Sequence, residues 1–265
     1  MTSPNYSDRR MVLEEVAKDG KALQHVDKIY QADREVVLRA VSENGAAIEY
    51  ASQDLLSDRE IVLKAVSSPL RGFFNRGPLQ CAAAALRDDH EIVMAAVSKN
   101  GMALQHAGTQ LRADRLIVMA AVSENGMCLV HASKELCSDA EIVRKAAAST
   151  AHLGYMALRY ASSSLLEDPG FIAGLSDDIR SEFYFLKAQM MSGNSCTKAI
   201  HAKHSARVAW IFILEQFATE LKLSSVQKNG AHLLVGEDHI PLDQSLSQTN
   251  LKKGALIELQ VVVAH

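Results

Sequence analysis

A segment of 25 residues recurs along much of this chain. Each copy opens with an aspartate, and successive aspartates lie 25, 25, 31, 25 and 25 residues apart. Residues 33–45 and 114–126 share the pattern D-R-x-x-V-x-x-A-V-S-E-N-G. A segment of this length is too short to bury its own apolar face. The copies are therefore expected to stack into an array. We number them repeats 1 to 6 by their opening residues, Asp8, Asp33, Asp58, Asp89, Asp114 and Asp139.

The apolar residues of each repeat follow a helical period. In repeat 2, Val36, Val37, Ala40 and Val41 fall on one face of a helix. Aromatic residues are only 5% of the chain, so small aliphatic side chains must fill the core. The pattern predicts closely packed helices rather than a β-sandwich.

Two further signals predict where the helices begin and end. Ser57 with Glu60, and Ser138 with Glu141, have the spacing of a capping box at the start of the helix. An Asn-Gly pair follows the helix, and its glycine is expected to be left-handed, with a second short helix after it. The glycines are Gly45, Gly101 and Gly126.

Three repeats depart from the consensus. Repeat 1 has Glu15 where later repeats have alanine, which predicts an exposed face. Repeat 3 is 31 residues long, and helix breakers there flank Phe73 and Phe74, our candidates for partner binding in the array. Repeat 6 has extra residues near 150–154, and a degenerate segment over 168–181 is expected to end the array.

Residues 5–167 resemble the helical repeat family known as domain of unknown function 4116. The resemblance rests on a D-R-E-x-V-x-x-A-V-x-x-N-G pattern over residues 33–45, followed by A-L-x-[YH]-A-S-x-x-L, to which residues 47–55 correspond. It implies a repeat module that has no established activity and occurs beside varied partner domains.

The chain changes character over residues 182–265. We predict strands at 183–186, 196–200, 231–235 and 255–263, and a helix at 208–223. The order β-β-α-β-β, the segment Leu233-Leu234-Val235-Gly236 and the stretch 246–259 resemble a ubiquitin-like β-grasp domain. The resemblance implies a docking patch at Met191, Leu233 and Gln260. The chain ends Val-Val-Ala-His rather than Gly-Gly, so conjugation is not expected.

Charge and composition exclude several classes of function. The net charge of −3 argues against a nucleic-acid binder. No apolar run reaches the roughly 20 residues of a membrane span, and the start of the chain has no apolar signal segment. None of the four cysteines forms a C-x-x-C pair, so we expect reduced thiols in the cytoplasm or nucleus.

Polar residues that recur from repeat to repeat are candidates for sites. His25, His106 and His131 share one repeat position, for which we favour packing over metal binding. For the arginines that follow the opening aspartates, we favour solvated faces or inter-repeat ion pairs over phosphate sites. They are Arg9, Arg34, Arg59 and Arg115. No nucleotide, zinc-protease or hydrolase motif is present, so we predict no catalytic residue, cofactor or metal.

The sequence therefore predicts a mainly α array of helical hairpins over residues 5–167 and a small α+β β-grasp domain over 182–265. The function expected is a non-catalytic scaffold or adaptor, whose array binds one protein while the ubiquitin-like domain docks to another. Two alternatives remain: an RNA-binding helical repeat protein, and a regulatory subunit of an enzyme.

Overall fold

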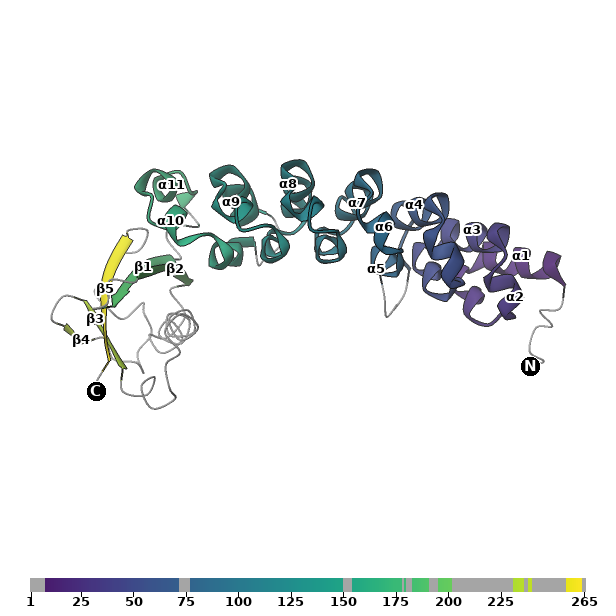
Figure 1. Ribbon diagram of the computed structural model, residues 1–265, viewed down its shortest axis with the longest axis horizontal. Helices are drawn as coiled ribbons and strands as arrows, with labels where there is room; N and C mark the ends of the chain where they lie inside the picture. Colours follow the sequence, from purple (N-terminus) through teal and green to yellow (C-terminus); the bar gives the residue numbers. More distant parts are fainter. Residues whose placement is uncertain are drawn as a thin grey trace. The chain divides into compact units, whose positions relative to one another are not determined.

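The computed structural model describes residues 8–71, 77–149, 154–177, 179, 183–190, 195–201, 231–235, 238–239 and 256–263. For residues 154–156 and the strands, only the backbone is described. The chain forms two compact units, Met1–Leu136 and Cys137–His265. The first unit contains repeats 1 to 5. Repeat 6 and the strands belong to the second (Figure 1).

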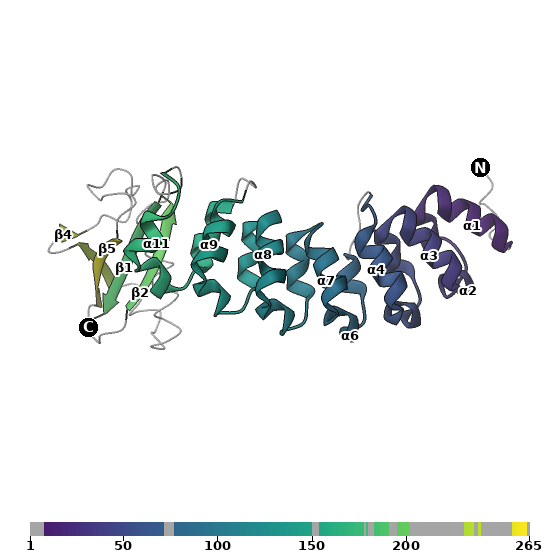
Figure 2. The ribbon, with the colours of Figure 1, turned by 90° about the horizontal axis from the view of Figure 1, so that it is seen from above.

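Each repeat of the first unit is one α-helix followed by short segments of one or two turns. The first helices lie side by side in chain order (Figure 2). They are α1 (Arg9–Lys18), α3 (Arg34–Glu43), α4 (Arg59–Ser67), α7 (His90–Val97) and α8 (Arg115–Glu124). The short α-helices are α2 (Lys28–Gln31), α5 (Pro78–Cys81) and α6 (Ala84–Arg87). The 3-10 helices are η1 (Gly20–Gln24), η2 (Gly45–Tyr50), η3 (Gln53–Ser57), η4 (Gly101–His106), η5 (Leu111–Ala113), η6 (Gly126–His131) and η7 (Leu136–Ser138).

The opening aspartate caps the first helix. Asp58 Oδ1 accepts hydrogen bonds from the backbone N–H of Glu60 (3.0 Å) and of Ile61 (3.2 Å). The predicted capping box is therefore wrong by one residue. Ser57 ends η3, and the equally good cap Asp58 takes its place. Asp139 likewise caps the helix of repeat 6 in place of Ser138.

The predicted apolar face forms the core of the array. Val36, Val37, Ala40 and Val41 are all fully buried, which confirms the prediction for repeat 2. The Glu15 side chain in repeat 1 is 41% exposed and pairs with Lys18, so its face is open as expected. Stacking of β-branched and alanine side chains thus supplies most of the apolar burial that holds neighbouring repeats together.

The second part of each regular repeat is not the continuous short helix that the sequence predicts. In repeat 2 it is two 3-10 segments, η2 and η3, separated at Ala51 and Ser52. The break has a clear cause, because the Ser52 N–H donates to the Gln31 carbonyl of the preceding repeat (2.8 Å) and so makes no intrahelical bond. The same bridge recurs at 2.9 Å between later repeats, as Ala83 to Leu56, Gly108 to Arg87 and Ser133 to Arg112.

The glycines of the Asn-Gly pairs serve close packing rather than a left-handed turn. Gly45 and Gly101 both have ordinary backbone angles, so the prediction of a left-handed residue is wrong there. A Cβ on Gly45 would lie 2.0 Å from the Ala65 carbonyl oxygen of the next repeat. The equivalent distances are 2.4 Å from Gly20 to Ala40 and from Gly101 to Ala121. Only glycine allows the backbones this near to each other.

Repeat 6 and the sheet make up the second unit. Its helices are α9 (Ala140–Ala147), η8 (Gly154–Tyr160), α10 (Ser163–Leu166) and α11 (Pro169–Ala173). Arg144 on α9 stacks over the Phe171 ring of α11, with 5.3 Å from its guanidinium carbon to the ring centre. The Ser162 N–H donates to the Cys137 carbonyl at 2.9 Å.

Five strands form one sheet in the order β2-β1-β5-β3-β4. The first and last strands, β1 and β5, pair in parallel, and the other neighbours pair antiparallel. The predicted strands all form, whereas the predicted helix at 208–223 lies outside the described residues. The strands are β1 (Phe183–Met190), β2 (Ser195–His201), β3 (Ala231–Val235), β4 (Asp238–His239) and β5 (Leu256–Val263).

The described helices are all short. None of them has the length and apolar character needed to cross a lipid bilayer.

Candidate functional site

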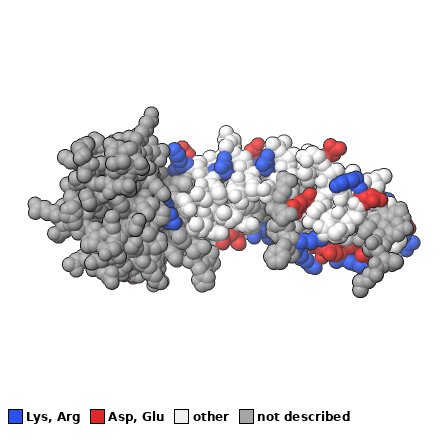
Figure 3. Space-filling view, turned by 90° about the horizontal axis from the view of Figure 1, so that it is seen from below, with Lys and Arg blue, Asp and Glu red and all other residues white. Residues whose placement is uncertain are grey.

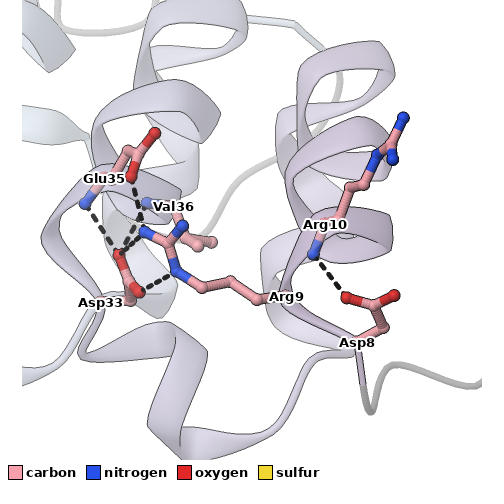
Figure 4. Close-up of polar contacts among 6 residues, drawn as sticks. All are labelled: Asp8, Arg9, Arg10, Asp33, Glu35 and Val36. Atoms are coloured by element: carbon pink, nitrogen blue, oxygen red, sulfur yellow. Dashed lines mark hydrogen bonds and ion pairs between the residues drawn. The ribbon is translucent and has the colours of Figure 1, made fainter.

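Ion pairs run along the starts of the first helices. Arg9 donates to Asp33 of the next repeat (2.8 Å) and to Glu35 (2.6 Å), as Figure 4 shows. The other Asp33 oxygen caps α3 through the N–H groups of Glu35 and Val36. The Arg9 hydrogen bond, with support from these N–H groups, lowers the pKa of the Asp33 carboxyl.

The same arrangement recurs at the next two junctions. Arg34 binds Asp58 (2.7 Å) and Glu60, and Arg59 binds Asp89 (2.7 Å) and Glu91. The hydrogen bond from its arginine lowers the pKa of the Asp58 and Asp89 carboxyls. The predicted inter-repeat pairing is thus confirmed for Arg9, Arg34 and Arg59.

The junction between repeats 4 and 5 differs in its polar contacts. His90 takes the position of the arginine, and its Nε2 lies 3.9 Å from Asp114 Oδ2. Leu116 replaces the glutamate and is 65% exposed. The glycine contact and the backbone bridge are both kept here, so the closure of this junction depends on backbone packing.

The junction between repeats 3 and 4 differs in its packing. Repeat 3 has no Asn-Gly pair, and Leu70 stands where the glycine would be. A pocket of about 210 Å³ opens there between α4, α5, α7 and η4. Leu70, Leu79 and Met102 are among the apolar residues that line it, and Lys99 is the one lysine or arginine in its described lining.

The junction between repeats 3 and 4 keeps two inter-repeat contacts besides the pocket. Arg59 bridges to Asp89 and Glu91 of the next repeat, and the Gly108 N–H bonds to the Arg87 carbonyl. The start of the insertion is also fixed, because the Asn44 side chain both donates to the Arg71 carbonyl (3.0 Å) and accepts from its N–H (3.2 Å). The described walls of the pocket are thus held in place without a ligand.

Charges are unevenly distributed on the face drawn in Figure 3. Blue and red side chains intermingle towards the N-terminal repeats, whereas white, uncharged residues predominate over the middle of the array.

The residues predicted for partner binding fall largely outside the described part of the chain. Phe73, Phe74 and Met191 are not among the described residues. Leu233 lies on β3 opposite Val261, and Gln260 on β5 opposite Leu234. The pocket beside the insertion is not among the predicted sites. The sign of this pocket in the sequence is that repeat 3 lacks the Asn-Gly pair. The repeat pattern alone predicts only a longer turn there.

The histidines at the shared repeat position do not form one site. His25 is exposed, whereas His106 and His131 are partly buried. Burial, with the nearby charge of Arg112, lowers the pKa of His131, so this imidazole is neutral at neutral pH. Among the residues that the structure describes, no group of three or more His, Cys, Asp or Glu side chains is placed to hold a metal ion.

One protein family matches much of the repeat array. The family described as "Domain of unknown function (DUF4116)" matches residues 33–71, 78–112 and 114–166. These three segments end or begin close to the repeat boundaries, and the gap from 72 to 77 falls in the insertion of repeat 3. No curated protein matches the chain. Residues 33–166 therefore carry repeats of the DUF4116 family within a helical region.

Proposed function

We propose that this chain is a non-catalytic scaffold that binds other proteins. The observation that carries the proposal is the pocket at the junction between repeats 3 and 4, where the glycine that packs against the next repeat at the neighbouring junctions is missing. Most polar groups that recur from repeat to repeat hold neighbouring repeats together, as Arg34 and Ser52 do. The junction between repeats 3 and 4 instead leaves a pocket whose described lining residues are mostly uncharged. A rigid array with a local binding surface is typical of solenoid proteins.

We further propose that residues 182–265 form a ubiquitin-like β-grasp domain that docks to a second protein. The strand order β2-β1-β5-β3-β4 supports this, because the first and last strands of a β-grasp sheet lie parallel at its centre. A hairpin of β1 and β2 on one side and the antiparallel β3 on the other agree with the same topology. The domain boundary at 182 belongs to this proposal.

Affinity purification with mass spectrometry tests the scaffold proposal. The baits are the full chain and a chain that lacks residues 182–265, with circular dichroism to check that the helices of the shortened chain remain. We expect two sets of partners, of which one is lost with the deletion. An unchanged set of partners would sink the docking role of residues 182–265, and the absence of any specific partner for either bait would sink the scaffold itself.

A further inference from the structure

The pocket between repeats 3 and 4 has a definite structural origin. At the junctions that the neighbouring Asn-Gly pairs close, the glycine packs against an alanine carbonyl of the next repeat, as Gly45 does against Ala65. At this junction Leu70 stands in the glycine's place, and Ala96 of the next repeat lines the pocket instead. The space is therefore built in by the sequence of repeat 3.

The size of the pocket limits what it can hold. Pockets for drug-sized ligands and cofactors usually enclose about 300–1,000 Å³. This one encloses about 210 Å³, and its mouth is open to solvent. A volume of this size suits one large side chain of a partner, which is how most protein interfaces anchor their central residue.

The lining shows which chemistry the anchor needs. Leu70, Leu79 and Met102 offer apolar surface, whereas the exposed Lys99 stands at the end of α7. None of the lining residues that the structure describes is an aspartate or a glutamate. A partner whose apolar side chain is flanked by carboxylates would fit both the apolar lining and the lysine. Its carboxylates would complement the charge of Lys99, and its apolar side chain would leave water for the apolar lining.

We propose that this pocket binds an acidic segment of a partner protein through one large apolar side chain. The inference rests on the proposed scaffold function and names the partner class of its array. Because Arg59 and the Gly108–Arg87 bridge hold the two repeats at a fixed distance, the pocket is formed before the partner arrives. Binding then needs little ordering of the array, which favours affinity.

The test uses the full chain with ¹³C-labelled methionine methyl groups. The probe is the peptide N-acetyl-Glu-Phe-Glu-amide, and its controls are the Glu-Ala-Glu and Lys-Phe-Lys analogues. We expect the Met102 methyl signal to shift with a Kd on the order of 1 mM for the probe, and at least about tenfold weaker binding of either control. Met94 and Met119 do not line the pocket, so their signals should not move.

Matched variants locate the binding. K99E should weaken binding about fivefold, and A103L should abolish it by filling the pocket. K64E makes the same charge change at an exposed lysine outside the lining and should bind as the natural chain does. Equal binding by the natural chain, K99E and A103L would overturn the proposal, as would the absence of any Met102 shift.

Two other outcomes are also decisive. If the double variant F73A/F74A binds the probe more than tenfold tighter, the chain's own insertion is the occupant and the proposal fails. If the full chain captures specific partners and K99E and A103L capture the same set, the pocket proposal fails while the scaffold function stands.

Discussion

The junction between repeats 2 and 3 and the junction between repeats 3 and 4 are neighbours in the array. At both junctions the first α-helices of the two repeats lie side by side, and the difference lies in the segment that follows the helix. Between repeats 2 and 3, Gly45 packs so close to the Ala65 carbonyl that there is no room for a Cβ. Between repeats 3 and 4, the Asn-Gly pair is missing and a pocket opens. Both junctions keep the arginine pair and the backbone bridge. The close approach of the two backbones therefore depends on one glycine position, whereas the ion pair and the backbone bridge are common to both junctions.

The largest effect is expected from adding one methyl group at the closed junction. Gly45→Ala should lower the free energy of unfolding by about 3 kcal/mol, because the new Cβ would overlap a backbone oxygen that cannot move freely. Gly77→Ala is the matched control, since none of the residues that the structure describes lies within 4 Å of its Cβ position. It should be neutral or up to ~1 kcal/mol more stable. Urea denaturation measures the free energy of unfolding of both variants. Equal losses of this free energy would show that the close contact between Gly45 and Ala65 does not contribute to stability.

A smaller loss is expected at the helix caps that both junctions share. Asp58→Ala removes the cap of α4 together with the Arg34 pair and should cost about 1.5 kcal/mol. Asp58→Asn keeps the capping oxygen and should cost less than half as much. Urea unfolding of the two variants separates the cap from the ion pair. A loss for Asn as large as that for Ala would assign the effect to charge instead.

The ion pairs should make both junctions sensitive to acid. The folded-state pKa values of Asp33, Asp58 and Asp89 lie below the usual 3.8 because each accepts a hydrogen bond from an arginine. Their contribution is thus fully present above that value and is lost as the pH falls through the lower folded pKa. Each exposed pair should supply less than about 1 kcal/mol. Unfolding measured between pH 6 and 2 should show a smaller acid loss for Asp58→Asn than for the natural chain, and identical profiles would contradict the pairing.

Thiol labelling should compare the accessibility of two buried cysteines of the array without any change to the sequence. Burial raises the pKa of the Cys128 thiol to about 12, so it should react with iodoacetamide only after unfolding. Cys81 is also buried, but it lies on the short helix α5, which borders the open pocket. Mass spectrometry of labelled peptides should find Cys81 modified before Cys128. Faster modification of Cys128 would mean that η6 of repeat 5 opens more readily than the helix that borders the pocket.

The residue pattern is enough to predict the array but not all of its local geometry. Valine and alanine spacing predicts the buried face, and Val36 and Ala40 lie where expected. The Asn-Gly pair predicts the usual left-handed glycine after a helix, whereas Gly45 is needed by a neighbouring backbone. The break at Ser52 is caused by a bond to Gln31 in another repeat, which no local propensity encodes.

The candidate site can be predicted only in part for the same reason. The arginine pairs result from charge at a fixed repeat position, so Arg34 and Arg59 can be assigned to inter-repeat contacts. The pocket results from the missing contact between a glycine and the alanine carbonyl of the next repeat. The volume that remains beside Leu70 depends on how the two repeats stack. A sequence shows which residue is absent, but only the fold shows what space its absence leaves.

One pair of variants tests most directly whether the junctions are closed and open as described. Ala47 and Ala103 occupy the same position of repeats 2 and 4, but Ala47 is fully buried and Ala103 lines the pocket. Ala47→Leu should lower the free energy of unfolding by about 1–3 kcal/mol, and Ala103→Leu should change it by less than about 0.5 kcal/mol. Equal losses in urea denaturation, or a larger loss for Ala103→Leu, would contradict an open junction between repeats 3 and 4.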